Sequence, residues 1–109
     1  MRVPGITPQE YATLRETEGD KAPALIDVRE PWEFERARIE GARLLPLGDI
    51  FNWARKLDQA GSYVVMCHHG VRSAQAVLVL TRLGFRDVRN LNGGIDAWAR
   101  QVDPGVPLY

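Results

Sequence analysis

The sequence has little that would tie the protein to a disulfide scaffold, a nucleic acid or a membrane. It contains one cysteine, so no disulfide can form within the chain, and a lone thiol suits a reducing compartment. Its 14 basic and 14 acidic residues give a formal charge of zero, which argues against nucleic acid or an anionic membrane as the main partner. The first residues lack the apolar core of a signal peptide, and no apolar run could span a bilayer. These absences predict a cytoplasmic location.

Internal repeats and low-complexity linkers are absent as well. Of the 109 residues, 45% are apolar and 26% are charged, as is typical of a globular domain. A chain of this length buries roughly two thirds of its extended surface on folding, and it needs neither disulfides nor a metal to be stable. We therefore expect residues 1–109 to form a single domain.

Short apolar runs alternate along the chain with apolar residues at helical spacing. Strands are predicted at 24–28, 43–45, 63–66 and 88–91, and helices at 8–18, 31–34, 47–60, 71–83 and 95–98. Because helices separate the strands, parallel pairing is favoured. Trp32, Trp53 and Trp98 lie in helical patterns and are expected to pack against the protein rather than to bind ligands. The pattern predicts a three-layer α/β domain with a mainly parallel sheet.

The loop from Cys67 to Arg72 joins a predicted strand to a predicted helix. A turn of this kind aims backbone N–H groups and the positive end of the helix dipole at one point, where an anion is stabilised. Ligands of parallel sheets bind at the carboxyl ends of the strands, where both Cys67 and Asp27 lie. A lone cysteine can also be a small buried apolar residue. The combination with Gly70, Arg72 and the helix start instead favours a reactive thiolate.

Charged residues near the loop leave several roles open. Arg72 can hydrogen-bond loop carbonyls or a carboxylate, can contact an anionic substrate, or can form a surface ion pair. A carboxylate after the first long strand, where Asp27, Glu30 and Glu33 lie, can pair with Arg72 or orient the loop. Alternatively, Asp27 satisfies backbone donors at a turn while Arg29 and Glu33 pair on the surface. The sequence does not separate these possibilities.

His68 and His69 are the two histidines of the chain and directly follow Cys67. We expect no metal here, because consecutive residues of a tight loop point in different directions and no further cysteine or histidine exists to complete a zinc site of the usual ligands. Carboxylates could in principle contribute. Either histidine could activate Cys67 or hold an anion when protonated. The simpler expectation is that both line the mouth of the pocket and shape its substrate preference.

Residues 66–73, Met-Cys-His-His-Gly-Val-Arg-Ser, resemble the active-site loop of single-domain rhodaneses, sulfurtransferases that carry sulfur as a cysteine persulfide. Three further stretches resemble other segments of that family in the same order, at 25–34, at 39–47 and within 83–98. One departure is Ala37-Arg38, where the family often has Gly-His. The resemblance covers nearly the whole chain. It implies a three-layer α/β/α rhodanese-like domain with a mainly parallel sheet of about five strands.

The resemblance also implies a mechanism. Cys67 would be the catalytic nucleophile, and the substrate would be bound by the rest of the loop, namely His68, His69, Gly70, Val71 and Arg72. Asp27 and Ser73 would support the loop. The sulfur donor would be a small molecule such as thiosulfate, and the acceptor would be cyanide, a small thiol or a protein. No cofactor or metal enters, and an external acceptor is required because no second cysteine can resolve the persulfide.

Two other functions remain open for such a sequence. Related phosphatases and arsenate reductases also place a cysteine and an arginine on a strand-loop-helix, but their loops are longer. Four residues separate Cys67 from Arg72, and the shorter loop suits a single sulfur atom rather than a phosphate ester. The second alternative is a sulfur carrier or docking module that does not turn over. A carrier would load from a protein persulfide and ignore thiosulfate.

Overall fold

The computed structural model describes residues 3–109, which are built around one five-stranded sheet. Its strands are β1 (Gly5–Ile6), β2 (Ala24–Asp27), β3 (Arg43–Leu44), β4 (Ser62–Met66) and β5 (Asp87–Leu91). The spatial order is β1-β5-β4-β2-β3, and every neighbouring pair is parallel. Strand β4 therefore lies at the centre of the sheet, and the cysteine loop follows its carboxyl end. The α/β class and the parallel pairing predicted from the sequence are confirmed.

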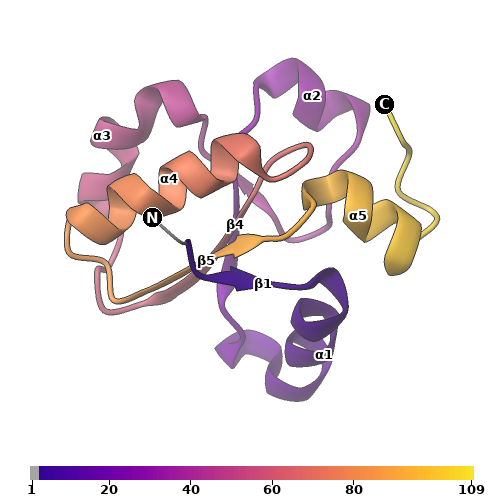
Figure 1. Ribbon diagram of the computed structural model, residues 1–109, viewed down its shortest axis with the longest axis horizontal. Helices are drawn as coiled ribbons and strands as arrows, with labels where there is room; N and C mark the ends of the chain where they lie inside the picture. The colour runs from indigo at the N-terminus through magenta and orange to yellow at the C-terminus, as the bar shows by residue number, and fades with distance from the viewer. Residues whose placement is uncertain (1–2) are drawn as a thin grey trace.

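Helices cover both faces of this sheet (Figure 1). The α-helices are α1 (Pro8–Glu18), α2 (Pro31–Arg36), α3 (Ile50–Trp53), α4 (Val71–Arg82) and α5 (Gly94–Gln101), and short 3₁₀ turns are η1 (Gly19–Lys21), η2 (Leu47–Asp49) and η3 (Ala54–Lys56). Helices α1 and α5 pack together on one face, and α3 and α4 cover the other. Within residues 3–109, we find no helix whose length and apolar character would let it cross a membrane.

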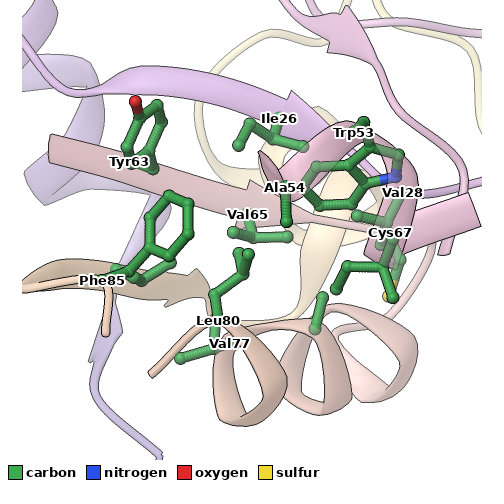
Figure 2. Packing of buried hydrophobic residues seen from close by; sticks show 13 residues of the cluster. Ile26, Val28, Trp53, Ala54, Tyr63, Val65, Cys67, Val77, Leu80 and Phe85 are labelled. Carbon is green, nitrogen blue, oxygen red and sulfur yellow. The ribbon is translucent and has the colours of Figure 1, made fainter. Parts of the chain in front are cut away.

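The side chains of β4 alternate between two buried clusters because successive strand residues point to opposite faces. Val64 and Met66 belong to the cluster beneath α1 and α5. Val65 and Cys67 belong to the cluster beneath α3 and α4, where Figure 2 shows Val77 and Leu80 of α4 reaching toward the strand. Because both faces of β4 are covered, its sequence is a continuous run of apolar residues after Ser62. This central position gives Cys67 a rigid support.

Several local expectations from the sequence are wrong. The pattern gave no sign of β1, which is only two residues long and pairs with β5 at the edge. The helix predicted over 47–60 is three short pieces, η2, α3 and η3, and Trp53 Nε1 folds back to donate to the carbonyl of Pro46 at 2.9 Å. Phe51, in the same stretch, is 66% exposed. Trp32 is 59% exposed, although its ring still packs against Tyr109 in an edge-on arrangement.

Candidate active site

Cys67 lies at the carboxyl end of β4 with its side chain only 1% exposed. Its sulfur accepts two backbone hydrogen bonds, from Gly70 N–H at 3.1 Å and from Ser73 N–H at 3.4 Å. The loop turns back on itself at Gly70, whose φ of +103° lies in the left-handed region that favours glycine. One N–H from the residue before α4 and one from its first turn thus point toward the thiol. Donors of this kind stabilise a negative charge on sulfur.

Ser73 and Asn90 form a second layer beneath the sulfur. The Ser73 hydroxyl lies 3.3 Å from Cys67 Sγ and donates to Asn90 Oδ1. Asn90 Nδ2 in turn donates to the Gly70 carbonyl at 3.2 Å, so the amide bridges β5 to the loop. Because the single Ser73 proton is used on Asn90, the thiol form of Cys67 is the donor to Ser73. Asn90 was not predicted from the sequence, although a polar residue near the carboxyl end of a strand is a usable signal.

The start of α5 holds the opposite side of the loop. Ile95 N–H donates to the Cys67 carbonyl at 2.9 Å, and Asp96 N–H donates to the His68 carbonyl at 3.1 Å. Gly94 is buried with a φ of +62°, and a Cβ at this position would collide with the carbonyl oxygens of Cys67 and His68. The main chain of α5 therefore approaches the loop as closely as glycine permits. The loop is clamped between two helix N-termini.

Gly94→Ala is expected to destabilise the fold by about 3 kcal/mol, since it combines an unfavourable positive φ with a backbone collision. Chemical denaturation of both proteins measures this difference. Gly48→Ala is the matched control, because Gly48 is exposed and a Cβ there would meet nothing within 4 Å. A Gly94→Ala protein as stable as the Gly48→Ala protein would contradict the close approach of α5.

Arg72 is committed to Glu33 of α2. Its two terminal nitrogens donate to the two carboxylate oxygens at 2.6 and 2.9 Å, a bidentate pair. Glu33 is buried, and this hydrogen bonding lowers its pKa to about 2 despite the opposing effect of burial. The pKa of Arg72 is raised, chiefly by the same pair. Of the partners considered for Arg72, the structure provides a carboxylate, and the pair ties the first turn of α4 to α2.

Asp27 contacts Arg29 rather than the loop. Asp27 Oδ2 lies 2.7 Å from Arg29 Nη2, and both side chains are fully buried. Arg29 also donates to the carbonyl of Ala37 at 2.6 Å and to the hydroxyl of Tyr109 at 2.7 Å. Of the alternatives that the sequence left open, the one in which Arg29 pairs on the surface does not hold, because the side chain is buried. Asp27 reaches the cysteine loop only indirectly, because the Tyr109 hydroxyl donates to Glu33 Oε2 and Glu33 holds Arg72.

Acidification is expected to weaken the link between Glu33 and Arg72. The folded-state pKa of Glu33, about 2, lies below the ordinary value of 4.5, so its contribution to stability is present above pH 4.5 and is lost as the pH falls toward 2. Glu33→Gln should cost about 2 kcal/mol near pH 7. Its deficit relative to the wild type should shrink between pH 4.5 and 2.

Denaturation midpoints measured across this pH range test the prediction. Glu35→Gln removes an exposed carboxylate from the same helix and should change stability by less than about 0.5 kcal/mol at every pH. A Glu33→Gln deficit that stays constant down to pH 2 would exclude the linkage.

An aromatic stack stands beside the loop. The His68 ring lies parallel to Tyr109, with centroids 4.0 Å apart and 8° between the planes, and His69 stacks on it at 3.9 Å. His68 is half-buried, and burial followed by the nearby His69 lowers its pKa. His69 and Val71 are exposed. The predicted site residues from 67 to 73 thus form one continuous loop, whereas the side chain of Asp27 contacts Arg29 instead of this loop.

Comparison with known proteins identifies the family. The family model for the rhodanese-like domain matches residues 7–101. Thiosulfate sulfurtransferase GlpE of Pseudomonas putida is 33% identical over 93 residues, which are 85% of this chain and 82% of that protein. A rhodanese-related protein of Thermoplasma volcanium superimposes with a TM-score of 0.80 at 31% identity, covering 97% of this chain and 99% of that one. The chain belongs to the rhodanese-like domain family.

A longer relative shows the domain in another setting. The probable adenylyltransferase/sulfurtransferase MoeZ of Mycobacterium tuberculosis is 42% identical over 106 residues. The match takes in 95% of this chain but only 26% of that protein. The chain thus spans about a quarter of the length of this relative. The similarity to this relative therefore concerns the domain alone and does not identify the substrates or partners of this chain.

Proposed function

We propose that the protein is a thiosulfate sulfurtransferase that forms a persulfide on Cys67. The proposal treats residues 1–109 as one rhodanese-like domain, which the family match over 7–101 supports. The observation that carries it is the position of Cys67 Sγ, buried at the end of β4 and hydrogen-bonded by the N–H groups of Gly70 and Ser73. A packing cysteine has no need of these donors. A thiolate and a persulfide both do.

The reaction has two steps, each a displacement at sulfur. In the first, the Cys67 thiolate attacks the outer sulfur of thiosulfate, the sulfur–sulfur bond of the donor breaks, and sulfite leaves with the electron pair. In the second, an acceptor such as cyanide or a thiol attacks the outer sulfur of the persulfide. The sulfur–sulfur bond of the persulfide breaks, its electron pair goes to Cys67 to regenerate the thiolate, and thiocyanate or a new persulfide is released. Neither step requires a cofactor.

The loop residues supply charge stabilisation and shape. Val71 and Arg72 open α4, so their N–H groups have no carbonyl partner within the helix. In the proposal these groups bind the terminal sulfur of the persulfide, which carries the negative charge. The guanidinium of Arg72 stays paired with Glu33, so Arg72 acts by holding the loop in place. Its positive charge also lies near the persulfide. His68 and His69 line the entrance and select the substrate.

An assay with two substrates tests the function. Thiosulfate and cyanide should yield thiocyanate, while p-nitrophenyl phosphate should not be hydrolysed, because four residues between Cys67 and Arg72 leave too small a loop for a phosphate ester. Ester hydrolysis without thiocyanate would overturn the proposal in favour of a phosphatase. If Cys67 takes up sulfur from a protein persulfide but not from thiosulfate, the protein is a sulfur carrier and not a thiosulfate sulfurtransferase.

A further inference from the structure

A cluster of three possible metal ligands lies beside the proposed active site. His68 and His69 come from the loop, and Asp96 comes from the first turn of α5. One ligand atom of each residue lies within 4.8 Å of the other two. The sequence predicted no metal because consecutive loop residues were expected to point in different directions and no further histidine or cysteine was available, but the His68 and His69 rings instead stack with centroids 3.9 Å apart. The fold adds a carboxylate from a residue 27 positions further along the chain, counted from His69 to Asp96.

Backbone and side-chain contacts position two of these ligands, His68 and Asp96. Asp96 N–H donates to the His68 carbonyl at 3.1 Å, so the helix start and the loop cannot separate without breaking this bond. The parallel Tyr109 ring at 4.0 Å fixes the plane of His68. Asp96 is held by a hydrogen bond from Arg100 to one of its oxygens, Oδ2, at 3.0 Å. Arg100 is 60% exposed, and such an exposed pair contributes little and yields readily to a cation.

The remaining adjustment is small. Ligand atoms around a tetrahedral zinc ion stand about 3.4 Å apart, because zinc bonds to nitrogen and oxygen measure about 2.1 Å. The present separations, at most 4.8 Å, exceed this by no more than about 1.4 Å. His69 is exposed and can rotate off its stack to close the gap. Two imidazoles and one carboxylate prefer zinc, cobalt, nickel or copper to magnesium or calcium.

The geometry points to a transition-metal site formed by His68, His69 and Asp96, with a fourth position open to water or an anion. Zinc is the ion whose catalytic sites most often combine three protein ligands of this kind with one open position. The site lies beside Cys67, on the two histidines proposed to line the entrance, and its metal binding can be measured without turnover. A failure of metal binding leaves the proposed sulfurtransferase activity untouched.

Cobalt titration of the Cys67→Ser protein, free of any histidine tag, tests the site, because the serine removes the thiolate as a competing ligand. We expect one Co²⁺ ion per chain, with visible d–d absorption of a four- or five-coordinate ion, displaceable by Zn²⁺ but not by Mg²⁺. Asp96→Asn in the same background should weaken binding at least about 10-fold. This change keeps the backbone N–H that contacts His68.

Two further variants make the result decisive. His69→Ala removes an exposed ligand without disturbing the core, and it should weaken binding as Asp96→Asn does. Asp20→Asn, at an exposed position in η1, is the matched control and should leave the affinity unchanged. Thermal denaturation confirms that each variant is folded. Absence of a bound ion, or equal affinity in the Asp96→Asn and Asp20→Asn proteins, would overturn the site.

Discussion

Replacing Cys67 by serine is expected to reduce sulfur transfer at least about 10⁴-fold, because the serine hydroxyl neither ionises near neutral pH nor forms a persulfide. The loop should survive, since Gly70 and Ser73 N–H groups can donate to oxygen as they do to sulfur. The measurement is thiocyanate production from thiosulfate and cyanide, with circular dichroism to confirm the fold.

Ser73→Ala is the control for this change. It removes the hydroxyl that lies 3.3 Å from the sulfur but leaves the thiol and both backbone donors. The loss of one hydrogen-bonding group corresponds to about 1 kcal/mol, so the rate should fall roughly 10-fold or less. If Cys67→Ser retained as much activity as Ser73→Ala, the sulfur would not travel through Cys67.

The largest loss of stability is expected at Asp27. Both Asp27 and Arg29 are 0% exposed, so Asp27→Ala leaves a guanidinium charge buried without its carboxylate. Breaking a buried pair on one side costs about 3–5 kcal/mol, a large part of the total stability of a small domain. Chemical denaturation measures the change in the free energy of unfolding.

A double variant separates the pair from its surroundings. Asp27→Ala with Arg29→Leu removes both charges, although Arg29 also donates to the Ala37 carbonyl and to Tyr109. We expect the double variant to be more stable than Asp27→Ala alone, because the uncompensated charge is gone. A Glu35→Gln protein, altered at an exposed carboxylate, should differ little from the wild type. Asp27→Ala with the stability of that control would show that the pair does not stabilise the fold.

The parts of the fold that could be predicted from sequence are those in which one strong pattern acts over several residues. Apolar runs indicated β2 and β4, because strands covered on both faces are apolar at successive positions. Helical spacing after Cys67 indicated α4. The edge strand β1 was missed, since two residues carry no periodicity. The stretch over 47–60 has apolar residues at helical spacing, but in the fold it forms the short pieces η2, α3 and η3 instead of one helix.

In the candidate site, too, the features with a local sequence pattern were predicted and those without one were not. The local loop around Cys67 was recognisable, because its residues are consecutive and its chemistry depends on a helix start. Residues that contact this loop from elsewhere in the chain could not be recognised in the sequence. Asn90 bridges to Gly70 from β5, and Asp96 meets His68 from α5, across sequence separations that no local pattern reports. The choice of Glu33 as the partner of Arg72 likewise depends on where α2 packs.

The buried charge of Arg29 could not have been predicted from residue type, since arginine is almost never fully buried unless it is paired. Its burial follows from the acceptors gathered around it, namely the Asp27 carboxylate, the Ala37 carbonyl and the Tyr109 hydroxyl. These lie on segments that meet only in the folded protein. The sequence therefore left open whether Arg29 paired on the surface, and only the packing resolves it.

The most direct test of the account is the intact mass of the reduced protein after incubation with thiosulfate. We expect a gain of one sulfur atom, about 32 Da, that later addition of cyanide removes and that Cys67→Ser cannot acquire. Alkylation of the thiol before thiosulfate should prevent the gain. If Cys67 alkylates readily yet takes up no sulfur from thiosulfate, the central claim that this thiol carries sulfur from thiosulfate is contradicted.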